Sequence, residues 1–179
     1  MTTHPSLRTR FRTLRLCLLS ALASTVLIAQ KAPWSVVLLQ GPLHVGDDHI
    51  KSYQHPRPEV KAYRAEFEMP QHVKHSVADS FVLVVSIADL VMPRDKHRAK
   101  AYRDGKYRTK VLINHEEIVV LNKLAKVSES PANVDRIEIE LKGTAFRDGM
   151  NVLEIVPGAD GKNLDDFEIH RIELIAQGQ

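Results

Sequence analysis

The stretch YRAEFEM, residues 63–69, alternates apolar and charged side chains along its whole length. A period of two is typical of a β-strand that buries one face and leaves the other in water. Residues 81–90 are instead mostly apolar on both faces, which predicts a strand in the centre of a sheet. Shorter segments of strand character follow along the chain: 111–114, 118–121, 137–141 and 152–156.

The last segment of the chain carries a break in this period of two. Phe167 and Ile169 lie on one parity, whereas Ile172 and Leu174 lie on the other. One inserted residue would bring both pairs to the same face, so we predict a β-bulge near His170-Arg171. The alternative is a strand that is buried on both faces between two layers.

The whole pattern predicts an all-β domain. About seven or eight short strands, without a long helical pattern or a regular alternation of strands and helices, indicate an antiparallel β-sandwich. Residues 93–103 are the one segment with helical character, and Asp104-Gly105 would end that helix. Residues 114–117 predict a hairpin loop, with Asn114 where a positive φ is tolerated. Residues 40–60, with three prolines, predict an irregular loop.

The N-terminal segment has the parts of a secretory signal. Four arginines and no acidic residue lie between positions 8 and 15, and an apolar run over 16–29 follows. About 14 apolar residues suit a signal and are fewer than the roughly 20 that a membrane-spanning helix needs. We therefore predict a Sec-type signal helix at 1–29, a single domain at 30–179, and a bacterial periplasmic or secreted location. Leu27 is large for a position close to the cleavage site, so an uncleaved membrane anchor is the alternative.

The leader accounts for two features of the raw composition. The whole chain has 25 basic and 22 acidic residues, net +3, but the part after the leader holds 21 and 22, net −1. The basic charge therefore supplies no argument for a nucleic-acid partner. The one cysteine, Cys17, also lies in the leader, so the domain has no disulfide and must fold on its hydrophobic core.

The second half of the sequence carries a series of short motifs. In order they are VLIN at 111–114, Ile118 with Leu121-Asn122, IEIEL at 137–141 and GMNVLEI at 149–155. Over roughly residues 80–175 this series resembles galactose-binding-like jelly rolls, such as the sugar-binding domains of glycoside hydrolases and several carbohydrate-binding modules. The resemblance implies a jelly-roll sandwich, a fold that many functions share. His115 stands where the family usually has glycine, so no ligand role is transferred to it, and Asn114 and Asn151 are predicted to be turn residues.

Residues 94–110 form a basic segment. Eight basic residues stand here against two acidic ones, net +6, which leaves about −7 for the rest of the domain. Cations among tyrosines suit an acidic polysaccharide, because Arg and Lys pair with carboxylate or sulfate and Tyr stacks on a sugar ring. The predicted ligand-binding residues are Arg98, Lys100, Tyr102, Arg103, Tyr107 and Arg108. The alternative is a solvated loop, or one that pairs with the acidic part of the same protein.

Two loops are rich in aspartate. Asp47 and Asp48 follow the first strand, and Asp165 and Asp166 precede the last one. Carboxylate oxygens are ligands that Ca²⁺ prefers, and the resemblance implies a structural calcium between loops at one end of the sandwich. We therefore predict these four residues as calcium ligands, with polar turn residues as the alternative. No other cofactor is expected.

Motifs for zinc binding or catalysis are missing from the sequence. His72 and His75 stand three residues apart, but there is no HExxH and no cysteine cluster, so we expect no zinc site. There is also no GxSxG elbow and no glycine-rich phosphate loop. We expect an exported, non-catalytic module that binds carbohydrate. The alternatives are a structural or interaction protein of a bacterial envelope assembly, and a polysaccharide-active enzyme.

Overall fold

The computed structural model describes residues 34–70, 73, 79–95, 97–126 and 132–177. All of them belong to one compact unit, Lys31–Gln179. The predicted signal helix at 1–29, with Cys17, lies outside the described residues. The described part contains no helix that is long and apolar enough to cross a membrane.

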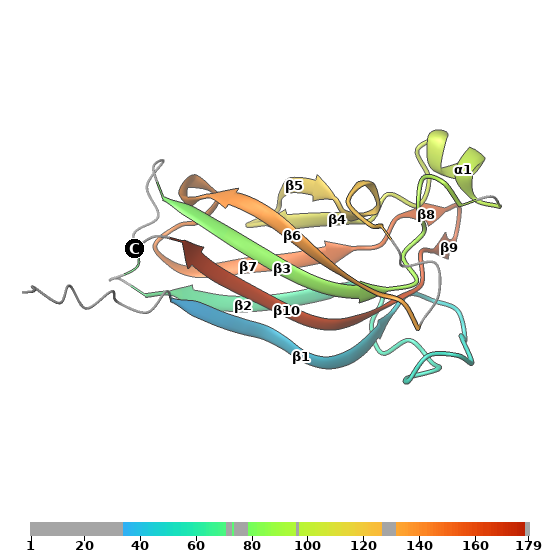
Figure 1. Ribbon diagram of the computed structural model, residues 1–179, viewed down its shortest axis with the longest axis horizontal. Helices are drawn as coiled ribbons and strands as arrows, with labels where there is room; N and C mark the ends of the chain where they lie inside the picture. The colour runs from blue at the N-terminus through green and yellow to red at the C-terminus, as the bar shows by residue number, and fades with distance from the viewer. Residues whose placement is uncertain (1–33, 71–72, 74–78, 96, 127–131, 178–179) are drawn as a thin grey trace, which may run out of the picture. The chain divides into compact units, whose positions relative to one another are not determined.

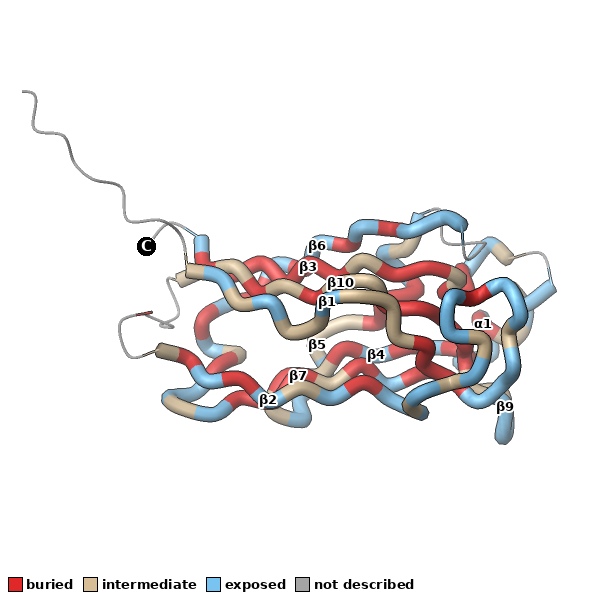
Figure 2. The backbone as a smooth tube through the Cα atoms, turned by 90° about the horizontal axis from the view of Figure 1, so that it is seen from below, coloured by how far each residue is buried: buried red, intermediate tan, exposed pale blue. Residues whose placement is uncertain are grey.

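Two four-stranded antiparallel sheets lie face to face (Figures 1 and 2). Sheet A has the order β1 (Ser35–Val45), β10 (Phe167–Gln177), β3 (Ser80–Ala88) and β6 (Val134–Lys142). Sheet B has the order β2 (Tyr63–Met69), β7 (Gly149–Val156), β4 (Lys110–Ile113) and β5 (Glu116–Val120). The prediction of an all-β antiparallel sandwich is confirmed.

The strand pairing makes this sandwich a jelly roll. The first strand pairs with the last, β2 with β7, β3 with β6, and β4 with β5, so that four antiparallel pairs are nested along the chain. The pairs β10–β3 and β7–β4 then join them into two sheets. Eight strands wound in this way form the two Greek keys of a jelly roll, as the resemblance implied.

Apolar side chains from the inner faces form the core. In β6 every second residue is buried, and Ile137, Ile139 and Leu141 point inward while the charged residues between them are exposed. The large inward residues Phe81 in β3 and Phe167 in β10 are completely shielded from water. Each contributes about 1.5–3 kcal/mol of burial free energy. The strand β3, predicted to be central, does lie between β10 and β6.

The predicted bulge in the last strand is confirmed. Ile169 pairs with Ile87 and Arg171 with Ser86, which leaves His170 without a partner in β3. Both apolar pairs of β10 therefore face the core, and none of the four side chains is more than 1% exposed.

A tyrosine ties the free edge of sheet A to sheet B. Tyr63, in β2, donates its hydroxyl hydrogen bond to the carbonyl of Leu38 in the edge strand β1, at 2.9 Å. Its ring is 6% exposed, and burial raises the pKa of the phenol to about 12. The bond satisfies an edge carbonyl that no neighbouring strand would reach.

Some predicted boundaries were wrong. Residues 40–45, predicted as loop, continue β1, although bulges interrupt its pairing around them. The helical segment is short, because α1 covers only Ala99–Arg103 before Asp104-Gly105 ends it. The hairpin turn has two residues, Asn114 and His115, and Glu116 already begins β5. The structure adds short elements that the sequence pattern did not indicate: η1 (Leu121–Lys123), η2 (Gly143–Ala145), β8 (Ala159–Asp160) and β9 (Asn163–Leu164).

The two ends of the domain differ. At one end Ser35 pairs with Ile175, close to where the described chain begins and ends. At the other end, where Val45 pairs with Phe167, lie α1, β8 and β9 (Figure 1). The basic segment and the aspartate loops are thus gathered at the end of the sandwich opposite the Ser35–Ile175 pair.

Candidate functional site

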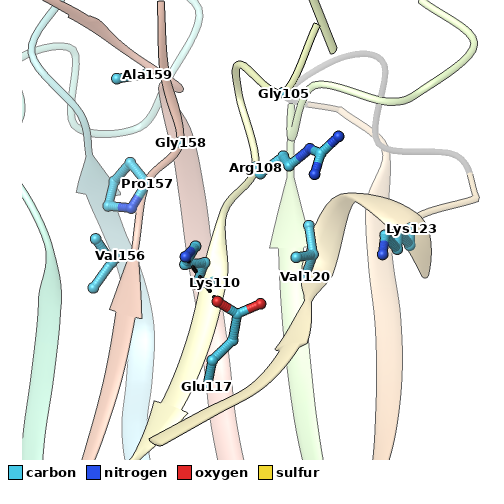
Figure 3. Close-up of a pocket in the computed structure, with 10 residues that line it drawn as sticks. All are labelled: Gly105, Arg108, Lys110, Glu117, Val120, Lys123, Val156, Pro157, Gly158 and Ala159. Carbon is cyan, nitrogen blue, oxygen red and sulfur yellow. Dashed lines mark ion pairs between the residues drawn. The ribbon is translucent and has the colours of Figure 1, made fainter. Parts of the chain in front are cut away.

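A pocket of about 560 Å³ opens at the α1 end of sheet B (Figure 3). Its walls come from the start of β4, the end of β5 with η1, and the segment that follows β7. Charged and apolar groups share the lining: Arg108, Lys110, Glu117, Lys123, Val156 and Pro157. A pocket of this size and mixture is typical of a site for a small ligand or for a short part of a larger one.

The pocket carries an excess of positive charge. Lys110 forms an ion pair with Glu117 at 2.7 Å. Arg108 and Lys123 have no ion pair within the part of the chain that the structure describes. Two cations are therefore left to bind an anionic ligand, and the Lys110–Glu117 pair offers both a donor and an acceptor beside them.

Thr109 fixes the two basic residues on either side of it. Strand alternation turns its side chain inward, where it is completely buried, and leaves its exposed neighbours on the pocket side. Its N–H donates to Asn122 Oδ1 at 2.7 Å, and its hydroxyl donates to Asp165 Oδ2 at 3.0 Å. The same hydroxyl accepts from Gly158 N at 3.2 Å, while its carbonyl accepts from Leu121 N at 2.8 Å. The 3-10 helix η1 and the segment after β7, which both line the pocket, are thus bonded to this one residue.

Asp165 is the buried centre of this network. Asn122 Nδ2 donates to Asp165 Oδ2 at 3.1 Å, and the backbone N–H of Val91 donates to Oδ1 at 3.3 Å. Burial raises the pKa of Asp165 to about 7, although these bonds and that from Thr109 act in the opposite direction. Asp165 therefore holds the pocket wall and is not available to a metal ion, which corrects its prediction as a calcium ligand.

The other predicted ligand-binding residues are mostly engaged elsewhere. Arg98 lies 5.6 Å from the ring centre of Tyr107, and Lys100 pairs with Asp104 at 2.7 Å. Tyr102 and Tyr107 are only 8% and 9% exposed, so neither ring offers a face to a sugar and the predicted stacking is wrong. Arg103 is exposed on α1, and Arg108 is the one predicted residue that lines the pocket.

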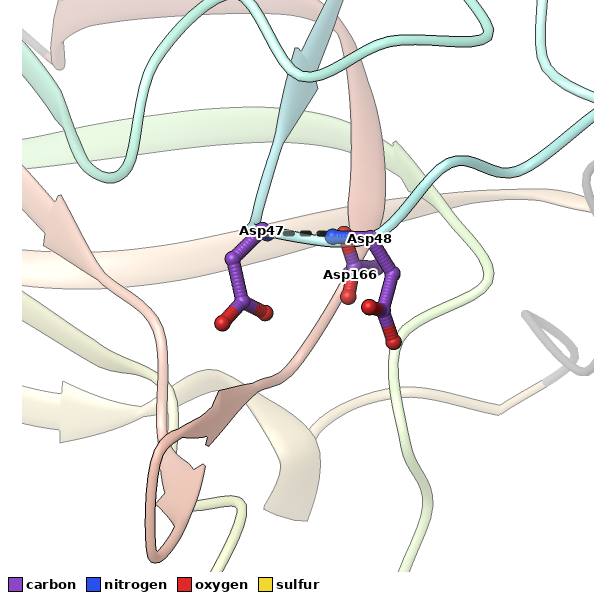
Figure 4. A group of neighbouring side chains, drawn as sticks. All are labelled: Asp47, Asp48 and Asp166. Carbon is purple, nitrogen blue, oxygen red and sulfur yellow. Dashed lines mark hydrogen bonds between the residues drawn. The ribbon is translucent and has the colours of Figure 1, made fainter.

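Three of the four predicted calcium ligands do come together (Figure 4). Carboxylate oxygens of Asp47, Asp48 and Asp166 lie within 4.8 Å of one another, from the loop after β1 and the residue before β10. Asp166 Oδ1 accepts from the backbone N–H groups of Asp47 and Asp48, both at 3.0 Å, and contacts His44 Nε2 at 3.2 Å. Asp47 also accepts from Leu164 N at 2.9 Å.

This acidic cluster fits a calcium ion only in part. Ca²⁺ takes six to eight oxygen ligands, and the hydrogen bonds above already occupy one oxygen each of Asp47 and Asp166. A bond from Asn163 Nδ2 at 3.0 Å occupies one oxygen of Asp48. In the described part of the chain no histidine belongs to a group of three metal-binding side chains, and His72 and His75 lie outside it.

No family model and no curated protein matches the sequence. Among solved structures, the chain is similar to a β-porphyranase of glycoside hydrolase family 86 from the human gut bacterium Bacteroides plebeius, at 10% identity and a TM-score of 0.42. That match covers 82% of this chain but only 21% of the hydrolase. A family 35 carbohydrate-binding module from an environmental isolate matches at 9% identity and a TM-score of 0.35, over 76% of this chain and 91% of the module. At these TM-scores the likeness identifies no ligand, and the jelly roll is assigned from the strand order itself.

Several pocket residues had no signal of function in the sequence. Lys123 comes from η1 and Glu117 from β5, away from the basic segment, and only the fold brings them to Arg108. Lys110 belongs to the basic segment but was not among the predicted ligand-binding residues. Alternation along the strand does place Lys110 on the outer face, and this could have identified it.

Proposed function

We propose that this domain is a non-catalytic module that binds an acidic polysaccharide through the pocket at the α1 end of sheet B. The observation that supports it is the pair of cations, Arg108 and Lys123, which face one pocket without an acidic partner in the described chain. A guanidinium binds a carboxylate or sulfate through two parallel hydrogen bonds, and a lysine adds a second positive charge.

The remaining lining suits a sugar ring. Glu117 and Lys110 provide an acceptor and a donor for hydroxyl groups. Val120, Val156 and Pro157 provide apolar surface for the C–H face of the ring. Because the pocket opens at one end of the domain and holds only a few groups, it would bind a short part of the polymer.

The proposal includes export. The arginine-rich, apolar N-terminal segment and a fold without cysteine both agree with a periplasmic or secreted domain. Polysaccharides of the envelope or the surroundings would be the accessible ligands there. Membrane contact would occur only through residues 1–29, if they are not removed.

Affinity electrophoresis of the purified protein tests the binding. We expect retardation in gels that contain polygalacturonate or a sulfated galactan, and no retardation with a neutral galactomannan. Arg108→Ala with Lys123→Ala should reduce retardation at least about tenfold, because each charge-assisted contact is worth more than about 1 kcal/mol. Added salt should weaken binding by the wild type.

Lys142→Ala is the matched control. It removes one exposed cation from β6, next to Ser80 and far from the pocket. It should leave retardation unchanged. No retention of the wild type on any acidic polysaccharide would overturn the proposal, and co-purification of one stoichiometric envelope protein would then favour a docking role.

A further inference from the structure

A second pocket, of about 380 Å³, lies on the loop that follows β1, and we call it the loop pocket. Its lining consists of His49, His55, Pro56 and Arg57, and none of these residues lines the first pocket. Two imidazole rings and one proline ring thus provide flat, mostly apolar surface, and one guanidinium provides a charge.

The charge of this loop is positive. Residues 49–58 include one lysine, one arginine and no acidic residue. His55 Nδ1 lies 3.7 Å from Glu59 Oε2, whereas the exposed Arg57 has no ion pair within the part of the chain that the structure describes. The guanidinium of Arg57 is therefore left to bind an anionic ligand.

Buried polar side chains hold this loop in place from below. The carboxylate of Glu168, which is almost completely buried, accepts from the N–H groups of Gln54 and His55 at 2.9 and 3.4 Å. His44 is also buried, and its Nδ1 donates to the carbonyl of His55 at 2.8 Å. The buried ring of Tyr53 packs edge-on against that of His44, with the ring centres 4.5 Å apart. Burying such groups is unfavourable unless they are bonded, and here their bonds go to the loop.

The loop pocket is consequently formed before a ligand binds. The N–H of Ile50 donates to the carbonyl of Pro56 at 2.9 Å, and the neighbours of these two residues, His49 and Arg57, line the same pocket. Binding residues are often carried by loops that a rigid scaffold positions. A loop that is already ordered loses little conformational entropy when it binds.

We propose that the loop pocket is a second binding site for the acidic polysaccharide and holds one hexuronate residue of the polymer. This rests on the proposed function, because one polymer would occupy both pockets. The C–H face of the sugar would lie on Pro56 and the imidazole rings. The carboxylate of the same sugar would accept two parallel hydrogen bonds from Arg57.

The β8–β9 hairpin links the two pockets at the α1 end of the domain (Figure 1). Ala159, in β8, lines the first pocket. In β9, Leu164 N donates to Asp47 at 2.9 Å and Asn163 Nδ2 donates to Asp48 at 3.0 Å, directly before the first residue of the loop pocket. A polymer that is held in one pocket would therefore reach the other as an intramolecular event, which increases its overall affinity.

Arg57→Ala tests whether the loop pocket binds the polymer. We expect its affinity for long polygalacturonate, measured by titration calorimetry, to be at least about tenfold lower than that of the wild type. The melting temperature should not change, because the side chain is exposed. Lys51→Ala is the matched control, since Lys51 is an exposed cation of the same loop that does not line the pocket. No loss in Arg57→Ala, or an equal loss in both variants, would overturn the assignment.

Nuclear magnetic resonance separates this site from the first pocket. Trigalacturonate is titrated into the wild type and into Arg108→Ala with Lys123→Ala, while the imidazole C–H signals of His49 and His55 are followed. We expect these signals to shift in both proteins, because a short ligand reaches the loop pocket independently. Neutral galactotriose should leave them in place, since it has no carboxylate for Arg57.

The two proposals fail in different ways. If trigalacturonate leaves the histidine signals unchanged while Arg108→Ala with Lys123→Ala weakens polygalacturonate binding, the loop pocket is refuted and the proposed function stands. If the signals shift but this double variant binds polygalacturonate as tightly as the wild type, the first pocket is refuted and the loop pocket is the binding site.

Discussion

Gly158 lies directly against the backbone of Arg108 (Figure 3). A Cβ atom at position 158 would overlap the backbone nitrogen of Arg108 and the carbonyl carbon of Tyr107. Gly158 also donates its N–H to Thr109 Oγ1, and its carbonyl accepts from Asp165 N at 2.8 Å. The chain after β7 is thus packed on the start of β4, and this contact fixes where Arg108 enters the pocket.

Gly158→Ala should destabilise the domain by about 2 kcal/mol or more, because the added methyl group forces two backbone segments apart. Urea unfolding measures the loss. Gly161→Ala is the matched control: Gly161 has a φ of +67° but open space around its Cα. The Gly161→Ala substitution should lower the free energy of unfolding only through backbone strain, by about 1 kcal/mol. Equal losses in the two variants would show that close packing is not what requires glycine at 158.

The hairpin turn at Asn114 and His115 contains avoidable strain. Both residues have positive φ, 52° and 71°, as a two-residue turn between antiparallel strands requires. Glycine adopts this conformation without the steric penalty that histidine carries. His115→Gly should therefore be more stable than His115→Ala by about 1 kcal/mol in thermal or urea unfolding. Both variants lose the exposed His115–Glu154 pair, so it cancels in the comparison. Equal stability of the two would contradict the role of the positive φ.

Much of the fold was predictable because each strand carries its own pattern. The alternation over residues 63–69 and 137–141 shows directly which side chains are buried, and the parity change after Ile169 revealed the bulge. β1 was less evident, since Gly41 and Pro42 interrupt it and its pairing with β10 shifts there. Only the partner strand makes this segment extended, and the partner lies more than a hundred residues away.

The candidate site was harder to predict for the same reason. Arg108 could be selected because it belongs to a visible run of cations. Lys123 could not, because its place beside Arg108 depends on Asn122 bonding to Thr109 and Asp165 in the interior. The prediction that Tyr102 and Tyr107 stack on a sugar failed for a different reason. A basic segment with aromatic residues indicates an exposed binding surface, whereas the fold buries both rings.

Tyr63 gives the stability of the domain a dependence on alkaline pH. Its phenol has a pKa of about 12 when folded, against about 10 in an unfolded chain. The folded state therefore keeps its proton at a pH where the unfolded state has lost it. This contribution to stability is complete below pH 10 and is lost as the pH rises toward 12.

Tyr63→Phe should lower the free energy of unfolding by about 1 kcal/mol at pH 8, because the hydrogen bond to the Leu38 carbonyl is lost. The difference in free energy of unfolding between the variant and the wild type should then shrink above pH 10, because only the wild type loses stability when this phenol ionises in the unfolded chain. Urea midpoints at pH 8 and pH 10.5 measure it. A difference that stays constant with pH would show that the Tyr63 hydroxyl does not titrate differently in the folded and unfolded states.

Calcium remains a prediction at the acidic cluster of Asp47, Asp48 and Asp166. Three carboxylates within 4.8 Å repel one another, and a divalent cation would relieve this repulsion by binding the folded state alone. We expect millimolar Ca²⁺ to raise the melting temperature and EDTA to reverse the effect. Asp48→Asn, which removes an exposed charge and keeps an oxygen, should reduce the response to Ca²⁺.

Asp160→Asn is the control for calcium, because Asp160 is an acidic residue at the same end that pairs with Lys106 at 2.6 Å. Its response to Ca²⁺ should equal that of the wild type. A melting temperature that calcium and chelator leave unchanged would mean that the cluster is held by its own hydrogen bonds. In that case Asp166 acts as a cap for the loop after β1, binding the N–H groups of Asp47 and Asp48 in place of a metal.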